Sequence, residues 1–390
     1  MITCFIISGK SISGAFGGGY SSVARSLESQ LTGLGIKTYL ISTNSKKTAM
    51  PLLPIYSLVF AWRILSICRK EKYEKIIVWG IGPWAFTFVI LNLFKNLIPF
   101  YFKTQFKSVA SYFTSIKHEF KGSVTAINIP DYGLSIKIKY LLLYLTLVQI
   151  LSLFERITLS TADLIITNYK STEKILSEEF GISKKKFIRT GFDLAIPKSN
   201  NGKIILPKKY ILTICRQDAR KGINYLLHAV RILKDKKIII PTLIVGDGEM
   251  LEENKKLAKK LGLIDTVTFS GFIKNSHLIL KNCTVFCLPT LEEGAGAIVL
   301  NEAMSYGLPI VSTNVDGITE DLKNDYSALI VPPKDPKSLA DAIEKLIKNP
   351  ELTKKLGTNA RKEFVKNHNS EKVSKELREL IRKILSKTNF

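Results

Sequence analysis

The sequence predicts an α/β protein with two successive domains, each built on a parallel sheet. The chain has 390 residues, which is more than one ordinary core accommodates. Short apolar runs alternate with segments whose apolar residues recur at helical spacing, as in βαβ units. The alternation restarts after a polar stretch at Ser199–Lys203, so the second half repeats the plan of the first.

The first half contains five apolar runs that we interpret as strands, with helical segments between them. The predicted strands are Thr3–Ile7, Lys37–Ser42, Lys75–Trp79, Ser108–Phe113 and Ala162–Thr167. The predicted helices are Val23–Leu34, Ile55–Cys68, Ala85–Phe94, Ile138–Leu153 and Ser171–Glu179. The uncharged run Ile76–Phe94 is long enough to cross a membrane, but glycines and a proline in its middle favour a strand, a turn and a buried helix. The run Tyr140–Phe154 is too short to span.

The second half repeats this alternation. Strands are expected at Tyr210–Cys215, Thr242–Val245 and Val267–Phe269, and helices at Ile223–Leu233, Met250–Leu261 and Leu339–Lys348. The stretch Thr284–Glu320 contains a strand, an acidic turn with glycines, a helix and a second strand. Two domains of this kind in succession are typical of twin Rossmann-like units. We expect domains at 1–197 and 198–369, followed by an amphipathic basic helix at 370–390.

Composition indicates a globular protein with an anionic partner. The formal net charge is +24, which favours nucleic acid, acidic lipid or a phosphate-rich substrate, although a lysine-rich genome would also produce it. The five cysteines are scattered and odd in number, as expected of reduced core thiols in a cytosolic protein. The N-terminus shows no secretory signal, since no basic region precedes its first apolar run. We therefore expect a cytoplasmic protein.

Lysines and aromatic residues are interleaved between Tyr101 and Lys139. Such a surface fits a protein that lies on anionic lipid. It fits a solvated face over a core equally well, and a nucleic-acid groove less well.

A glycine-rich turn follows the first predicted strand and includes Gly18 and Gly19. Backbone amides of such a turn, at the start of a helix, approach a phosphate or a sugar closely. The sequence Gly9-Lys10-Ser11 resembles the end of a P-loop, but Cys4 stands where the first glycine of that motif belongs.

Cations and carboxylates occupy two turns of the second half. Arg216 and Lys221 follow one predicted strand, whereas Glu292, Glu293 and Glu302 follow another. If both turns lie at the same sheet edge, the cations suit a diphosphate and a carboxylate suits the hydroxyl pair of a ribose. This combination indicates a nucleotide or a nucleotide sugar.

Several ordered motifs between Tyr210 and Ala360 resemble those of one enzyme family. They are RQDARKG at 216–222, VGDG at 245–248, VTFSG at 267–271, EEGAG at 292–296, NEAM at 301–304, YGLPIVST at 306–313 and DGITE at 316–320. In these motifs the chain resembles the glycosyltransferases of family 4, retaining enzymes with the GT-B fold. That fold implies two Rossmann-like domains facing across a cleft, with the final helix packed back on the first.

The resemblance implies roles for individual residues. Arg216 and Lys221 would hold the donor diphosphate, Glu302 would bind the ribose, and Glu293 would contact the sugar as a catalytic residue. The remaining donor-binding residues implied are Gly246, Phe272, Ile273, Gly296, Ala297 and Ile298, and Gly18 and Gly19 would form a loop for the acceptor or a phosphate. His118 is the candidate for the catalytic histidine that the family places near the reacting sugar, although a surface histidine would have the same sequence context. Glu119 is a candidate acceptor contact.

The chain departs from the family at one position. Eight residues separate Glu293 from Glu302, one more than the family has. Either a one-residue bulge keeps both glutamates in place, or Glu293 is displaced and the loop amides act without it.

The resemblance therefore implies a retaining glycosyltransferase that needs no metal or other cofactor. Its expected partners are a nucleotide-sugar donor, a glycan or lipid-linked acceptor and the anionic inner membrane face, with no nucleic acid. Three alternatives remain open: a nucleotide-sugar epimerase of the same fold, a basic protein that binds nucleic acid or membrane, and a scaffold whose donor site no longer functions.

Overall fold

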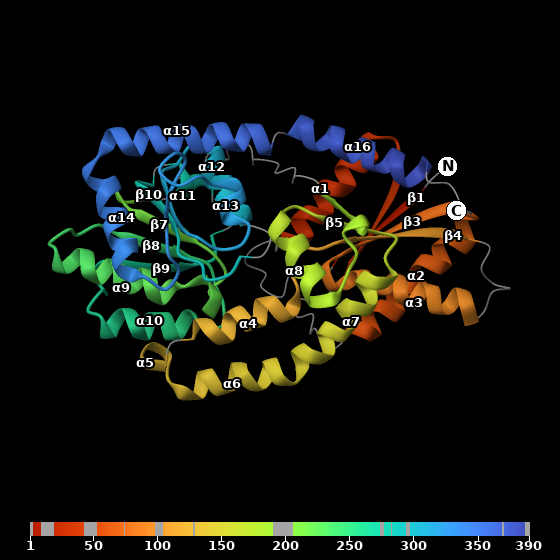
Figure 1. Cartoon of the computed structure of the whole chain (residues 1–390), viewed down its shortest axis with the longest axis horizontal. Helices are drawn as coiled ribbons and strands as arrows, with labels where there is room; N and C mark the ends of the chain where they lie inside the picture. Colours follow the sequence, from red (N-terminus) through yellow and green to blue (C-terminus); the bar gives the residue numbers. More distant parts are fainter. Residues whose placement is uncertain are drawn as a thin grey trace. The chain divides into compact units, whose positions relative to one another are not determined.

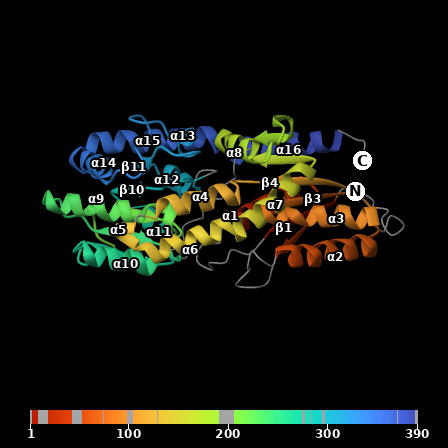
Figure 2. The same cartoon turned by 60° about the horizontal axis from the view of Figure 1, so that its bottom comes forward.

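The computed structural model describes residues 3–8, 19–42, 53–73, 75–97, 104–127, 129–189, 206–273, 277–281, 283–293, 297–368 and 370–386. The chain forms two compact units, and Figures 1 and 2 show a sheet with surrounding helices in each. Unit 1 consists of Met1–Lys117, Thr146–Asp193 and Ser370–Phe390, and unit 2 of His118–Leu145 and Leu194–Asn369. The domain predicted at 1–197 includes residues 118–145, whereas in the structure these residues belong to unit 2.

Unit 1 is built on a parallel sheet of six strands in the order β2-β1-β3-β4-β5-β6. The strands are β1 (Thr3–Ser8), β2 (Lys37–Ser42), β3 (Lys75–Ile81), β4 (Gln105–Ser111), β5 (Leu164–Thr167) and β6 (Phe187–Arg189). The helices are α1 (Gly19–Gly33), α2 (Leu53–Glu71), α3 (Phe86–Leu97), α7 (Leu147–Thr161), α8 (Lys170–Phe180) and α16 (Ser370–Ser386), with short 3-10 turns η2 (Gly82–Ala85) and η4 (Lys184–Lys186).

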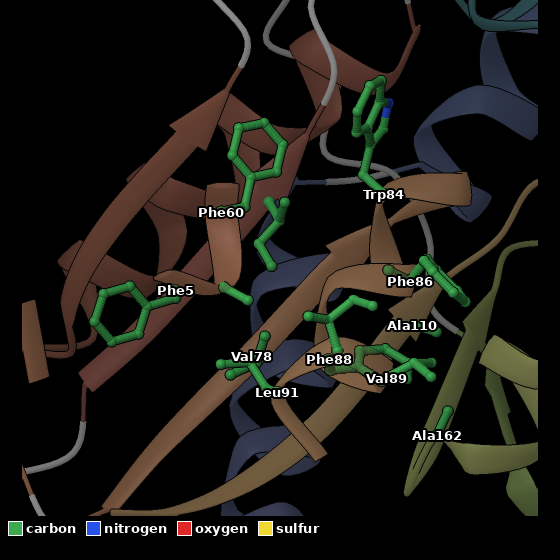
Figure 3. Packing of buried hydrophobic residues seen from close by; sticks show 14 of the residues in the cluster. Phe5, Phe60, Val78, Trp84, Phe86, Phe88, Val89, Leu91, Ala110 and Ala162 are labelled. Carbon is green, nitrogen blue, oxygen red and sulfur yellow. The ribbon is translucent and has the colours of Figure 1, made fainter. Parts of the chain in front are cut away.

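Helices cover both faces of this sheet, so its strands are apolar on both sides. Phe5 and Ile7 of β1 contribute to one core, and Cys4 and Ile6 contribute to the other, because successive side chains of a strand point to opposite faces. The first core includes Phe60 of α2, Val78 of β3, Trp84 of η2 and Phe88 of α3 (Figure 3). The second includes Leu27 and Leu31 of α1 and Leu377, Leu380, Ile381 and Ile384 of α16.

The predicted run of strand, turn and buried helix at 76–94 is confirmed as β3, η2 and α3.

The helix predicted at 138–153 is longer and is interrupted at Thr146, which separates α6 (Leu134–Leu145) from α7. By length and composition alone, Leu134–Thr161 could cross a membrane, which differs from the prediction that this run is too short. Leu159 of α7 nevertheless packs in the core of unit 1, and the buried carboxylate of Glu155 accepts a hydrogen bond from the backbone of Ile116 at 2.9 Å.

Unit 2 is built on a second parallel sheet, in the order β12-β11-β10-β7-β8-β9. The strands are β7 (Ile211–Ile214), β8 (Thr242–Val245), β9 (Val267–Gly271), β10 (Val285–Leu288), β11 (Ile310–Thr313) and β12 (Leu329–Val331). The helices are α9 (Ile223–Asp235), α10 (Leu251–Lys260), α11 (His277–Leu280), α12 (Ile298–Ser305), α13 (Ile318–Asp321), α14 (Pro336–Lys348) and α15 (Pro350–Asn367), with a 3-10 turn η5 at Ala219–Lys221.

Helices α4 (Ile116–Ala126), α5 (Ile129–Tyr132) and α6 carry the chain into unit 2. Asp131 of α5 accepts hydrogen bonds from Asn224 at 3.0 Å and pairs with His228 at 2.9 Å, both on α9. The buried Tyr132 hydroxyl donates to Asn254 of α10 at 2.7 Å. These polar contacts join α5 to α9 and α10 of unit 2, and they explain why residues 118–145 belong to that unit.

The predicted α/β fold with two Rossmann-like units is confirmed. All five cysteines are buried and none forms a disulfide, in agreement with the predicted core thiols.

Candidate functional site

The strand order of unit 2 reverses between β7 and β10. The first strand of the unit, β7, has the second strand on one side and the fourth, β10, on the other. In open α/β sheets, ligands bind outside the carboxyl ends of the strands at such a switch point. Two turns lie there: Cys215–Gly222 after β7, and Pro289–Glu293 after β10.

These two turns are in direct contact. The backbone N–H of Leu291 donates to the carbonyl of Arg220 at 2.7 Å. Gly222 has φ +66°, and a Cβ atom there would lie 2.1 Å from the carbonyl oxygen of Pro289. A glycine is therefore required both for the left-handed backbone and for the close approach of the neighbouring turn. The motif RQDARKG ends in glycine for this reason.

A third turn, Gly246–Gly248 after β8, is fixed by the buried Gln217. The Gln217 side chain donates to the carbonyl of Gly246 at 2.8 Å, and its backbone N–H donates to Asp247 at 2.9 Å. A Cβ atom on Gly248 would lie 2.3 Å from the carbonyl oxygen of Gln217. Asn254 donates to the Gln217 amide oxygen at 2.9 Å, so the contact of α5 with Asn254 extends to the turn after β7.

The structure brings Lys221 and Glu293 together, as expected if both serve one site. The Lys221 Nζ lies 2.5 Å from Glu293 Oε2, and both side chains are less than one-tenth exposed. Thr290 donates a hydrogen bond to the same carboxylate oxygen at 2.9 Å. Residues 294–296 lie outside the described part of the chain, and Gly296 is among them, so the predicted one-residue bulge before Glu302 stays a prediction.

Arg216 and Arg220 form ion pairs with Asp218. Arg216 Nη2 lies 2.9 Å from Asp218 Oδ2, and the Arg216 side chain is half exposed. Arg220 Nε lies 3.6 Å from Asp218 Oδ1. Burial acts to raise the pKa of Asp218, but the two guanidinium groups outweigh it and hold that pKa below its usual range. Asp218 therefore stays ionised and fixes both arginines.

Arg220 is the centre of the site's charge network, and it was not among the predicted site residues. Its guanidinium lies 2.6 Å from Glu119 Oε1 and 3.4 Å from Glu292 Oε2. Burial lowers the pKa of Arg220, but Glu119 and Asp218 outweigh it and raise that pKa well above its usual range. Arg220 stands directly before Lys221 in the motif, and the 3-10 turn places the two adjacent cations against different carboxylates.

His118 lies beside two carboxylates: Glu292, which the sequence indicated without a role, and Asp316, which was not among the predicted site residues. Its Nε2 is 3.7 Å from Glu292 Oε1 and 3.5 Å from Asp316 Oδ1. Asp316 also accepts a hydrogen bond from the backbone N–H of Glu293 at 2.8 Å. Burial raises the pKa of Glu292 to about 7, although Arg220 acts in the opposite direction. The predicted catalytic histidine is thus next to the turn that carries Glu293.

These three side chains also form a group that could hold a metal ion. One potential ligand atom from each of His118, Glu292 and Asp316 lies within 4.8 Å of the other two. The cation of Arg220 is 3.4 Å from one oxygen of Glu292 and would repel a metal there. The expectation that the protein needs no metal stays a prediction.

The remaining donor-binding candidates lie at the ends of β9 and at the start of α12. Phe272 and Ile273 directly follow β9, and the Phe272 side chain is exposed. Ala297 is buried, and Ile298 is the first residue of α12. Glu302 lies on α12, where burial raises the pKa of its carboxyl group to about 7. Gly18 lies outside the described residues, and Gly19 is the first residue of α1 in unit 1.

The sequence of unit 2 matches a known family. Residues 197–363 fit the family model for glycosyl transferases group 1. This part of unit 2 is therefore similar to the glycosyl transferases of group 1. An uncharacterized glycosyltransferase of Methanocaldococcus jannaschii is 30% identical over 174 residues, which cover 43% of this chain and 43% of that protein. The chain spans about half the length, or less, of the first curated relatives it matches.

Two solved structures resemble the chain over almost its whole length. Sucrose-phosphate synthase from Thermosynechococcus elongatus has a TM-score of 0.77 and 20% identity, with 99% of this chain and 100% of that chain covered. The Anabaena protein HepE, in complex with UDP-glucose, has a TM-score of 0.68 and 13% identity, with 98% and 100% covered. These similarities confirm the predicted GT-B fold, whereas the finer assignment to family 4 stays a prediction.

Proposed function

We propose that this protein is a retaining glycosyltransferase that transfers a sugar from a nucleoside diphosphate to an acceptor. The observation that carries the proposal is the cluster of Arg216, Arg220 and Lys221 at the strand switch point of a group 1 glycosyltransferase domain. Guanidinium and ammonium groups there can bind a diphosphate and stabilise the charge that develops when it leaves. The retaining stereochemistry rests on the resemblance to family 4.

Two cations of the site are paired with carboxylates, which has a consequence for donor binding. Lys221 is paired with Glu293 and Arg220 with Glu119. A diphosphate must replace carboxylates as the partner of these cations. Glu293, released from Lys221, is then available to accept hydrogen bonds from sugar hydroxyls. In this proposal Glu302 binds the ribose hydroxyl pair, and Phe272 and Ile273 offer backbone groups to the base.

His118 is proposed to act near the reacting sugar. Its neighbours Glu292 and Asp316 are both acidic, so the imidazole is positioned by two carboxylates. Glu119, one residue further along α4, forms an ion pair with Arg220. A diphosphate that replaces Glu119 as the partner of Arg220 would therefore change a contact of the helix that carries His118.

The acceptor is proposed to be a glycan or lipid-linked precursor at the cytoplasmic face of the membrane, since the chain carries a net charge of +24.

Isothermal titration of the whole chain with UDP, GDP, ADP and their glucose or mannose conjugates tests the donor site. UDP-glucose is the first choice, because it occupies the structurally similar HepE protein. We expect one base to bind selectively, and we expect Lys221→Ala and Glu302→Ala to lose that binding. Lys354→Ala, an exposed lysine of α15, is the matched control and should bind normally. If no nucleoside diphosphate binds, the proposed function is wrong.

Product analysis distinguishes transfer from epimerisation. Incubation with the preferred nucleotide sugar and a lipid-linked glycan extract should yield a longer glycan and free nucleoside diphosphate. Conversion of the nucleotide sugar into its epimer without any acceptor would instead identify an epimerase.

A further inference from the structure

Helix α2 of unit 1 presents an apolar face to solvent. Ile55, Leu58, Val59 and Trp62 are 57%, 45%, 54% and 71% exposed, respectively. Their spacing of three and four residues places them on one side of the helix. Exposed single apolar residues are common on protein surfaces, but four on one face that includes a tryptophan form a patch of the kind that marks an interaction site.

The opposite face of α2 already packs in the core. Phe60, Ile64 and Cys68 are at most 3% exposed and belong to the core cluster of unit 1. The helix is therefore apolar on both sides, and the packing seen among the described residues of unit 1 accounts for only one of them. A helix of this kind needs a second apolar environment for its outer face.

The charges near this face indicate which environment that is. Arg63 and Lys70 continue the exposed side of α2, and Lys72 follows its last turn; all three are exposed. No aspartate or glutamate occurs from Leu53 to Lys70, and the acid that follows, Glu71, lies 3.5 Å from Lys37. An apolar patch bordered by cations complements a bilayer whose headgroups are anionic.

We propose that the outer face of α2 inserts into the headgroup region of an anionic phospholipid bilayer, with Trp62 at the boundary between headgroups and acyl chains. The indole ring suits that position because its body is apolar and its N–H is polar. Arg63, Lys70 and Lys72 bind the lipid phosphates. This surface gives a definite location to the membrane attachment that the proposed function includes, and it rests on that part of the proposal.

The three tryptophans of the chain make a direct test possible. Trp79 and Trp84 are 2% and 5% exposed, so Trp62 accounts for the solvent-sensitive part of the fluorescence. On addition of vesicles that contain phosphatidylglycerol, the emission of the whole chain should shift to shorter wavelength and be quenched by brominated lipid. Trp62→Phe should remove the shift while the protein still floats with the vesicles, because phenylalanine keeps the apolar side chain.

Flotation of variants tests the location of the surface. Leu58→Ser with Trp62→Ser should lower vesicle binding by about tenfold or more, since two inserted apolar side chains are lost. The matched control is Leu142→Ser with Leu145→Ser on α6 of unit 2, where both residues are also more than half exposed. Nucleotide binding by the α2 variant reports on the donor site separately, and normal binding shows that the variant is folded.

Three results would overturn the proposal. One is binding that is lost in the α6 control and kept in the α2 variant. Another is unchanged Trp62 emission on vesicles to which the protein binds. The third is that neither the unmodified protein nor the α2 variant binds vesicles, while the unmodified protein is a dimer and the α2 variant is a monomer. The outer face of α2 would then be a contact between two copies of the chain. A failure of nucleotide binding in the unmodified protein would count against the proposed function. The vesicle-binding and fluorescence measurements would still decide whether α2 contacts the membrane.

Discussion

Replacement of Glu302 by glutamine should stabilise unit 2 at alkaline pH and weaken its binding of nucleotide. Burial raises the pKa of the Glu302 carboxyl group from 4.5 to about 7. Between these values the folded unit holds a proton that the unfolded chain has released. The contribution of Glu302 to stability is therefore fully present below the unfolded pKa and is lost as the pH rises towards about 7.

The size of this effect follows from the rise in pKa. One pKa unit corresponds to about 1.4 kcal/mol, so the full rise is equivalent to about 3 kcal/mol above neutral pH. Glu302 is half-buried, and water near the carboxylate reduces its cost, so we expect a difference between about 1 and 3 kcal/mol. Glutamine fills nearly the same volume and has no charge to bury, so the variant should not show this loss.

Urea denaturation at pH 5 and pH 8 measures this difference in the free energy of unfolding. The Glu302→Gln variant should match the parent at pH 5 and exceed it at pH 8. Glu351→Gln, at an exposed position on α15, is the control, because it makes the same substitution where no carboxylate is buried. Equal pH dependence in the parent and the Glu302→Gln variant would refute the reasoning.

The same substitution should reduce nucleotide affinity by about tenfold to a hundredfold, because hydrogen bonds to a charged group contribute about 1.5–3 kcal/mol. Nucleotide binding by Glu302→Gln that equals that of the parent would show that Glu302 does not contact the ligand. If Glu302→Gln gains stability and loses nucleotide affinity, the Glu302 carboxylate serves ligand binding at the expense of the stability of unit 2.

Three further expectations concern the same site. Lys221→Met should destabilise unit 2 by about 3–5 kcal/mol because it leaves the Glu293 carboxylate buried without its cation. Glu293→Gln added to this variant should recover most of that loss in denaturation experiments, and no recovery would show that the pair is not coupled. Gly222→Ala should abolish nucleotide binding, measured by titration with UDP, because a methyl group there forces the turn away from Pro289. Normal UDP binding by this variant would contradict the close approach of Gly222 to the Pro289 carbonyl oxygen. UDP binding near pH 7 should be accompanied by proton uptake, because an anion beside Glu292 raises the pKa of that group further. Calorimetry in two buffers of different ionisation enthalpy should detect this uptake, and Glu292→Gln should remove it. Binding heats of the parent that do not depend on the buffer would contradict the prediction.

The local pattern of the sequence was sufficient to predict most strands and most helices, and to raise the possibility that two turns share one edge of a sheet. The short strands β6 and β12 were missed. Arg216, Lys221 and Glu293 could be assigned because they follow predicted strands, and strand ends in a parallel sheet meet at one edge. The same reasoning included Glu292 without giving it a role, and it could have included Arg220, which stands beside Lys221. Nothing in the periodicity decides which of two adjacent turn residues points into the site.

The path of residues 118–145 could not be predicted from local pattern. Its attachment to unit 2 depends on single polar contacts, such as Asp131 with His228 and Tyr132 with Asn254, between residues about a hundred or more positions apart. Helical periodicity reports which side of a helix is apolar and says nothing about which sheet it meets. The same limit applies to α2, whose outer apolar face appears in the sequence as ordinary core residues.

The exchange of segments between the units has a consequence for synthesis on the ribosome. The chain passes between the units four times, and its last passage places α16 in unit 1. Leu377, Leu380, Ile381 and Ile384 complete a core that begins with Cys4 and Ile6. One face of the first strand therefore remains without its full apolar cover until translation is nearly finished. We expect nascent chains that stop before residue 370 to expose this face to chaperones, and to be sensitive to proteases in unit 1 even when unit 2 has folded.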